Sequence, residues 1–326
     1  MCPLTKVEPK LRAPILGFLK RLFKEKPMGT VGLVIVSIFL LSAIFANVIA
    51  PYPPNQFDPS SRIQGPSSAH FLGTDQLGRD LLSRIIFGAR ISVITGLAAG
   101  LLSLLLSIVI GVLGGYLGGV FDLITQRLLE VWGAIPNLYI LITLMAVLGP
   151  SLWNVILALS LSWGIGGARI VRGMVYAVKE NVYIEAAKSI GAGNVQIFIR
   201  HIIPNIVSTL IIMFTNRVPL IIMAEASLSF IGLGITPPTP SWGNLIAGEG
   251  RAWMMQQPMI AVAPGAALAI TVYGIVMFGD AIRDLLDPKL RGGSGSYVLT
   301  EKVKRKLQSL YVDNQLKTAT GDKNKD

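Results

Sequence analysis

Residues 91–121 read ISVITGLAAGLLSLLLSIVIGVLGGYLGGVF, a run of 31 residues without a charged side chain. About 20 apolar residues are enough to cross the hydrocarbon core of a bilayer, and an unpaired charge at its centre costs several kcal/mol. The run is therefore long enough for one membrane-spanning helix, and its glycine-rich end marks where that helix stops. This stretch indicates a chain built from helices that cross a membrane.

Five further stretches have the same apolar character. The charge-free stretch at 131–168 is too long for one helix, and Gly149-Pro150 divides it in two. The first stretch follows the basic residues 20–26 and exceeds the roughly 7 to 15 apolar residues of a signal peptide, which favours an uncleaved anchor. The sequence thus predicts an all-α polytopic membrane protein. Its six transmembrane helices are expected at 28–50, 91–121, 128–148, 152–174, 205–227 and 259–278.

The composition agrees with this interpretation. Hydrophobic residues make up 52% of the chain and charged residues 14%, whereas about 25% of residues are charged in an ordinary soluble domain. A mean hydropathy of +0.60 cannot come from a buried core alone, because a soluble protein of this length needs a large polar surface. The values exclude an ordinary soluble enzyme. The single cysteine, Cys2, excludes an intrachain disulfide and a cysteine-rich metal site.

The basic residues indicate how the chain is oriented. Six spans put both termini on one side, and 23 of the 29 lysines and arginines fall in segments on that side. Cytoplasmic segments carry this excess, so both termini are predicted to be cytoplasmic in a multi-pass protein of the cell (plasma) membrane. The net charge of +11 therefore reflects orientation, and the expected surroundings are membrane lipid, with no nucleic acid as a partner.

This map divides the chain into three predicted regions. A cytoplasmic N-tail at 1–27 and a cytoplasmic C-tail at 292–326 flank a transmembrane domain at 28–291. In the C-tail, residues 292–296 are typical of a flexible linker, and an apolar stripe at 299–310 either lies on anionic lipid or belongs to a solvated tail. The transmembrane domain carries three loops, expected at 51–89 and 228–258 outside and at 175–204 in the cytoplasm.

The two outer loops are rich in proline and glycine. The loop at 51–89 is predicted to end in a short separate helix from Asp80, either at the membrane interface or on the bundle. This loop is either a docking surface for an extracytoplasmic partner or a cover for helix ends. In the loop at 228–258, Trp242 and Trp253 are expected to anchor the chain at the membrane boundary.

The cytoplasmic loop has the pattern of two short helices. Gly191 can take the left-handed conformation of a C-terminal cap, Asn194 is a plausible N-cap for a second helix, and Pro204 is expected to break the chain before the next span. The first helix either docks into a groove of another protein or lies on lipid headgroups. One of its faces is predicted to hold Tyr183, Ala186, Ala187 and Ile190.

The residues of this loop also carry a resemblance. Glu185-Ala186-Ala187, followed by Gly191 and later by Pro204, resembles the EAA motif of permease subunits in binding-protein-dependent ABC importers. Four further blocks resemble the second permease of the dipeptide/oligopeptide/nickel class, so that the resemblance covers the chain from about residue 15 to 291. These blocks are HFLGTDQLGRDLLSR at 70–84, EASLSFIGLG at 225–234, PPTPSWG at 237–243 and GDAIRDLLDP at 279–288.

The resemblance implies a type I ABC importer permease fold and a set of partners. These are a second homologous permease, two ATP-binding subunits and an extracytoplasmic substrate-binding protein, for which Asp75, Arg79 and Asp80 are docking candidates. It implies transport of di- or oligopeptides, with nickel or oligosaccharides as alternatives. The residues implied in coupling to the ATPase are Glu185, Ala186, Ala187, Gly191 and Pro204.

The sequence contains no G-x-x-x-x-G-K-[ST], so it carries no P-loop of its own. The chain is therefore not expected to be an enzyme. No cofactor is expected on it, and ATP and Mg²⁺ would be bound by the partner subunits.

Ionisable residues within the spans are rare and suggest function. Arg217 and Glu225 lie about two helical turns apart, where they either line a translocation path and bind the charged ends of a peptide, or form an intersubunit salt bridge or a helix cap. A competing hypothesis is a proton-coupled secondary carrier that uses Glu130 and Glu225, although it does not explain the cytoplasmic loop. An intramembrane hydrolase is excluded, because no predicted span holds a histidine or a cysteine.

Overall fold

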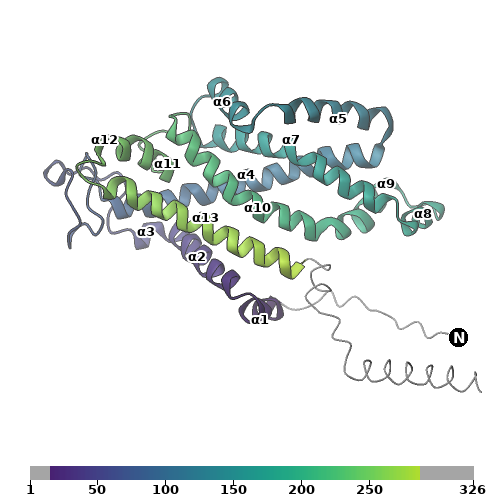
Figure 1. Ribbon diagram of the computed structural model, residues 1–326, viewed down its shortest axis with the longest axis horizontal. Helices are drawn as coiled ribbons and strands as arrows, with labels where there is room; N and C mark the ends of the chain where they lie inside the picture. Colours follow the sequence, from purple (N-terminus) through teal and green to yellow (C-terminus); the bar gives the residue numbers. More distant parts are fainter. Residues whose placement is uncertain (1–14, 287–326) are drawn as a thin grey trace, which may run out of the picture. The chain divides into compact units, whose positions relative to one another are not determined.

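The computed structural model describes residues 15–286 and is helical, with no β-strand in that range (Figure 1). By its internal contacts the chain divides into a unit from Met1 to Arg283 and a second from Asp284 to Asp326, of which only 284–286 are described. The predicted C-tail at 292–326, with its linker and apolar stripe, lies outside the described residues, as do residues 1–14 of the predicted N-tail.

The prediction of an all-α membrane protein is confirmed. Within residues 15–286, five helices are long and apolar enough to cross a membrane, and one bent pair of shorter helices raises the number to six. The first of the five is α2 (Pro27–Ile44), which follows α1 (Ile15–Glu25) and continues after a break at Phe45 into α3 (Ala46–Ile49). Pro27 suits the start of α2, because a proline in the first turn removes no helical hydrogen bond.

The second span is longer than the sequence predicted. α4 (Leu81–Leu117) is one helix of 37 residues, so the separate helix expected from Asp80 and the span expected at 91–121 are continuous. Asp80 caps this helix by accepting a hydrogen bond of 2.8 Å from the backbone N–H of Ser83. The polar residues near its start, Ser83 and Arg84, are buried, so of the two placements predicted for the segment from Asp80 the structure has the one on the bundle. Gly118 ends α4 with a φ of 67°.

Small residues let α4 pack closely on its neighbours. A Cβ atom at Gly111 would lie 2.6 Å from the carbonyl oxygen of Ala168 in α7 (Leu152–Lys179). A Cβ at Gly96 would lie 2.9 Å from Ile222 on the helix that follows the cytoplasmic loop. Glycine at such positions allows backbones to approach, as is common between membrane helices.

The third predicted span, 128–148, is not one helix. α5 (Gly119–Ala134) and α6 (Asn137–Leu148) meet at an angle of 92°. Pro136 causes the bend, because a proline disfavours the helical conformation of the residue before it. Ile135 accordingly has an extended backbone with φ −90° and ψ 127°.

The loop predicted to be cytoplasmic, for which the name cytoplasmic loop is kept, corrects two predictions. It consists of α8 (Val182–Ser189), α9 (Asn194–Ile197) and the π-helical turn η2 (Phe198–Ile202), and it leads into α10 (Ile203–Phe230). Pro204 does not break the chain, because it lies in the first turn of α10 and the wide turn η2 joins α9 to α10. Asn194 is the first residue of α9, and the N-cap position is occupied by Gly193.

The side predicted to face outward carries only short helical segments. The first outer loop ends at Asp80 and holds the 3₁₀ turn η1 (Pro59–Ser61). The second outer loop holds three further segments and leads into the last helix of the described chain. These elements are α11 (Trp242–Asn244), η3 (Leu245–Gly250), α12 (Arg251–Trp253) and α13 (Met259–Leu286).

Three clusters of buried apolar side chains hold the bundle together. The first lies among α2, α4, α10 and α13 and includes Trp242, which is 2% exposed and donates to the carbonyl oxygen of Ile85 at 2.9 Å. The prediction that Trp242 anchors the membrane boundary is therefore wrong. The second cluster joins α4, α6, α7 and α10, and the third joins α8 and α9 to α7 and α10. α8 and α9 lie at the opposite end of the bundle from α11 and α12 (Figure 1).

Candidate functional site

The cytoplasmic loop contains a helix stop of the predicted kind. Gly191 has a φ of +84°, and its N–H donates to the carbonyl oxygen of Lys188 at 2.9 Å. The next N–H, of Ala192, donates to the carbonyl oxygen of Ala187 at 3.0 Å. These two bonds form a Schellman motif, in which a left-handed residue satisfies the last carbonyl groups of a helix. The prediction of a glycine cap at this position is confirmed.

The helix α8 has one buried side and one exposed apolar side. Ile184 and Ala187 are buried in the third cluster, so the predicted face is wrong in one member: Ala187 points inward, whereas Tyr183, Ala186 and Ile190 are exposed. On the face of α8 that points away from the bundle, large apolar side chains remain exposed, and Ile190 is 87% exposed. Glu185 and Pro204 are also exposed. The loop thus presents an apolar surface at one end of the bundle, which suits contact with another protein.

Tyr116, at the end of α4, connects this loop to the bundle. Its hydroxyl donates to Oδ1 of Asn194 at 2.8 Å, and the ammonium group of Lys188 lies 6.0 Å from its ring. The Nζ of Lys179, at the end of α7, donates to the carbonyl oxygen of Tyr116 at 2.7 Å. A movement of α8 and α9 would therefore act on the ends of α4 and α7.

A buried cluster of four charged residues joins the two loops that are predicted to lie outside. Arg79 Nε donates to Asp75 Oδ2 at 2.6 Å, and Arg79 Nη2 donates to Glu249 Oε1 at 2.5 Å. The same Glu249 oxygen accepts from Arg84 Nη2 at 2.8 Å. The two positive and two negative charges balance. Burial raises the pKa of the Glu249 carboxyl above its ordinary value, and the positive charges of Arg84 and Arg79 oppose part of this rise. The cluster fixes the two loops to each other.

The docking prediction for this region needs correction. Asp75, Arg79 and Asp80 are 0%, 6% and 3% exposed, so their side chains are not a surface on which a partner docks. Asp75 and Arg79 belong to the charged cluster, and Asp80 caps α4 and lies 3.0 Å from His70 Nδ1. Their common effect is to hold the shape of the outer loop.

Sequence reasoning missed Arg84 and Glu249. Glu249 lies 165 residues from Arg84, and no local pattern around Glu249 indicates a partner in the first outer loop. The local signal at Arg84 is that a charged residue directly precedes the apolar residues 85–87 of a predicted helix.

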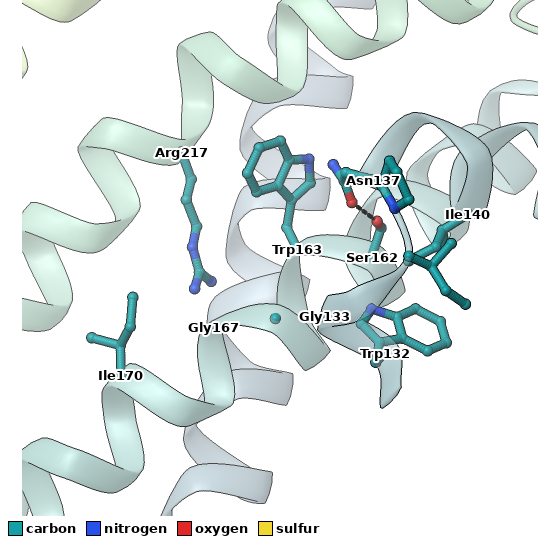
Figure 2. A pocket seen from close by; sticks show the side chains of 12 residues that line it. Trp132, Gly133, Asn137, Ile140, Ser162, Trp163, Gly167, Ile170 and Arg217 are labelled. Atoms are coloured by element: carbon teal, nitrogen blue, oxygen red, sulfur yellow. Dashed lines mark hydrogen bonds between the residues drawn. The ribbon is translucent and has the colours of Figure 1, made fainter. Parts of the chain in front are cut away.

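The candidate path residues Arg217 and Glu225 do not form one site. Arg217 lines a cavity of about 430 Å³ between the α5–α6 bend, α7 and α10 (Figure 2). Glu225 is 1% exposed, and its Oε1 accepts from Ser229 Oγ at 2.8 Å, toward the outer end of α10. The residue proposed for a proton relay, Glu130, is exposed and pairs with Arg127 at 2.8 Å.

No group of three or more histidine, cysteine, aspartate or glutamate side chains between residues 15 and 286 is arranged to hold a metal ion.

Known proteins resemble this chain over most of its length. A family model described as "Binding-protein-dependent transport system inner membrane component" matches residues 107–292, and one described as "N-terminal TM domain of oligopeptide transport permease C" matches residues 18–66. The glutathione transport system permease protein GsiD of Escherichia coli O1:K1 / APEC is 40% identical over 291 residues, which cover 89% of this chain and 95% of that protein. GsiD of Shigella flexneri serotype 5b is 43% identical with the same coverage.

Among solved structures, the inward-facing MetNI methionine ABC transporter (CY5 SeMet soak crystal form) matches with a TM-score of 0.47 and 19% identity. The match covers 64% of this chain and 96% of that chain.

Proposed function

The chain belongs to the family of binding-protein-dependent transport system inner membrane components, and from this membership we propose that it carries small peptides as one permease subunit of an ATP-driven importer. The relatives named as glutathione permeases and the match to an oligopeptide permease domain support peptides over nickel or oligosaccharides. The structural observation that carries the proposal is the exposed apolar side of α8, at one end of a bundle of membrane-spanning helices.

The proposed role of α8 is to couple this chain to an ATP-binding subunit. Glu185 and Ala186 lie on the exposed part of the loop and would contact the partner directly. Ala187 would seat α8 on the bundle, Gly191 would end the helix, and Pro204 would begin the helix that leads back into the membrane. The partner subunits would bind ATP and Mg²⁺. Closure of those subunits would move α8 and α9, and through Tyr116 the ends of α4 and α7.

The proposed assembly has one further membrane subunit and one soluble one. A second, related permease would supply the other half of the translocation path, and an extracytoplasmic binding protein would deliver the peptide to the outer loops. Asp75, Arg79 and Asp80 would contribute by keeping the first outer loop in shape. The location would be the cell membrane, with both termini in the cytoplasm, in agreement with the distribution of basic residues.

The proposal is tested by reconstitution. The chain is co-purified with its second permease and ATP-binding subunits and placed in proteoliposomes with ATP inside. The binding protein and a mixture of tripeptides are added outside, so that only complexes whose ATP-binding subunits face the lumen take up peptide. Peptide uptake is measured by mass spectrometry of the vesicle contents. We expect uptake that needs both ATP and the binding protein and that a proton ionophore does not reduce. Uptake by the chain alone, driven by a proton gradient and abolished by the ionophore, would contradict the proposal in favour of a secondary carrier.

A further inference from the structure

The cavity beside Arg217 contains a buried positive charge that no acidic side chain balances. Arg217 is 7% exposed, and no carboxylate in residues 15–286 lies within ion-pair distance of it. The more deeply buried Arg84, by contrast, pairs with Glu249 and Asp75. An arginine cannot lose its proton in a protein, and a charge inside a membrane segment is costly unless a partner is present. The unbalanced charge of Arg217 therefore indicates an anionic ligand.

Much of the hydrogen-bonding capacity of Arg217 is unused. Its Nη1 donates to Ser107 Oγ at 3.1 Å and to Ser103 Oγ at 3.4 Å. Both hydroxyl groups already donate to backbone carbonyl oxygens, so they act toward the arginine only as acceptors. Nε and Nη2 donate no hydrogen bond to any residue between 15 and 286. A guanidinium group has five N–H donors, and the unused ones can bind a planar anion in a bidentate manner.

The backbone of α7 leaves room for this guanidinium at the cavity wall. A Cβ atom at Gly167 would lie only 1.6 Å from Arg217 Nη2, so any other residue at this position would displace the side chain. Figure 2 shows Arg217 reaching from α10 toward Gly167, with Trp132 and Trp163 on other walls of the same cavity.

Two tryptophans that line the cavity have indole N–H groups without acceptors, but these nitrogen atoms are enclosed and do not face the open space. The indole N–H groups of Trp132, in α5, and Trp163, in α7, are buried and have no partner among the described residues. Leaving a buried donor unsatisfied costs about 1–3 kcal/mol. The side-chain oxygen of Asn137, which also lines the cavity, accepts from Ser162 Oγ. The group at this wall that remains open to a ligand is therefore the guanidinium of Arg217, which calls for negative charge and acceptor oxygens.

We infer that Arg217 binds a carboxylate group of the transported peptide inside the membrane. A carboxylate is planar, carries one negative charge and accepts up to about four hydrogen bonds, which fits the donors present. The cavity of about 430 Å³ has room for the residue that carries the carboxylate, beyond the group itself. The inference rests on the proposed function, because the carboxylate belongs to a peptide that the importer delivers. Its source is either the peptide C-terminus or an acidic side chain.

The test uses the reconstituted importer with a tripeptide mixture in which each sequence is present as the free acid and as the C-terminal amide, with and without aspartate or glutamate side chains. Uptake is compared between the wild type and Arg217→Gln. The binding protein is the same in both, so its own preference cancels when the acid-to-amide ratio of the variant is divided by that of the wild type. The matched control is Arg127→Gln, which removes an exposed arginine of α5 that does not line the cavity.

We expect Arg217→Gln to lower the uptake of carboxylate-bearing peptides by about tenfold or more and to leave peptides without a carboxylate unchanged. A loss confined to free C-termini or to acidic side chains identifies the source. Equal losses for acids and amides would overturn the inference and make Arg217 a structural residue. If Arg217→Gln does not assemble, Gly167→Ala displaces the guanidinium without removing its charge, and an unchanged acid-to-amide ratio in that variant would overturn the inference. A wild type that imports no peptide with ATP would instead overturn the proposed function, and this inference with it.

Discussion

Gly191 is the residue whose backbone conformation most directly limits what can replace it. Its φ of +84° is costly for any residue with a side chain, by about 1–2 kcal/mol, although the space around it is open. We expect Gly191→Leu to reach the membrane normally and to lower the population of the docked α8 by roughly five- to thirtyfold. Peptide uptake and binding-protein-stimulated ATP hydrolysis should fall together.

The matched control for this variant is Gly193→Leu. Gly193 also lies in open space, but its φ is −69°, which a leucine adopts without strain. Wild-type uptake in Gly191→Leu, or an equal loss in Gly193→Leu, would show that the left-handed cap is not what matters in this loop.

Glu249 is the residue on which the outer cluster depends most, because one of its oxygens accepts from both Arg79 and Arg84. Glu249→Gln keeps the shape and removes the charge, which leaves two buried arginines opposite Asp75 alone. Removal of one partner from a buried ion pair typically costs about 3–5 kcal/mol. We expect a clearly lower midpoint of thermal unfolding for the detergent-solubilised complex.

Glu130→Gln is the control for Glu249→Gln, since it makes the same chemical change in an exposed ion pair with Arg127. Exposed pairs contribute about 0–1 kcal/mol, so its midpoint should stay near that of the wild type. Equal midpoints of thermal unfolding for the two variants would mean that the charged cluster does not stabilise the folded protein.

Among the helices, the junction at Tyr116 is where the cytoplasmic loop meets the bundle. Tyr116→Phe removes the hydrogen bond to Asn194 and keeps the ring beside Lys179 and Lys188. The lost bond contributes about 0.5–1.5 kcal/mol, so assembly should persist while ATP hydrolysis becomes less dependent on the loaded binding protein. The ratio of stimulated to basal ATPase activity measures this. Tyr273→Phe, at an exposed position of α13, should leave the ratio unchanged. If the two variants give the same ratio, the proposed role of Tyr116 in coupling the loop to the bundle is contradicted.

The helices differ in how far the sequence predicted them. The spans and the cap at Gly191 follow from local rules, because an apolar run needs only its own length and a glycine cap only its own turn. The bend at Pro136 was missed, since the stretch at 128–148 is long and apolar enough for one span, and hydropathy does not show whether a helix runs straight. The continuity through Pro204 was missed because it depends on the π-helical turn before it. Of the sites, the charged cluster and the cavity at Arg217 depend on contacts between distant segments, which no local pattern contains.

For the whole chain, the orientation in the membrane can be measured with single cysteines. Cys2 is the only cysteine, so Cys2→Ser gives a background without thiols. Ser68→Cys and Gln196→Cys place one thiol at an exposed position of the first outer loop or of the cytoplasmic loop. We expect a membrane-impermeant maleimide added to intact cells to label Ser68→Cys alone, and labelling of Gln196→Cys to require broken cells. The reverse pattern would contradict the cytoplasmic assignment of both termini.

The distance along the chain between Glu249 and its arginine partners has a consequence for how the protein is made. Arg84 leaves the ribosome 165 residues before Glu249, which at about 5–20 residues per second is a delay of roughly ten to thirty seconds. Until then Arg79 has only Asp75, and the second outer loop that completes the cluster does not yet exist. The outer face must therefore close late in biogenesis, after most of the spans have been inserted. In a nascent chain arrested before residue 249, the first outer loop should be accessible to protease. In a chain released after the second outer loop has crossed the membrane, the first outer loop should resist the protease.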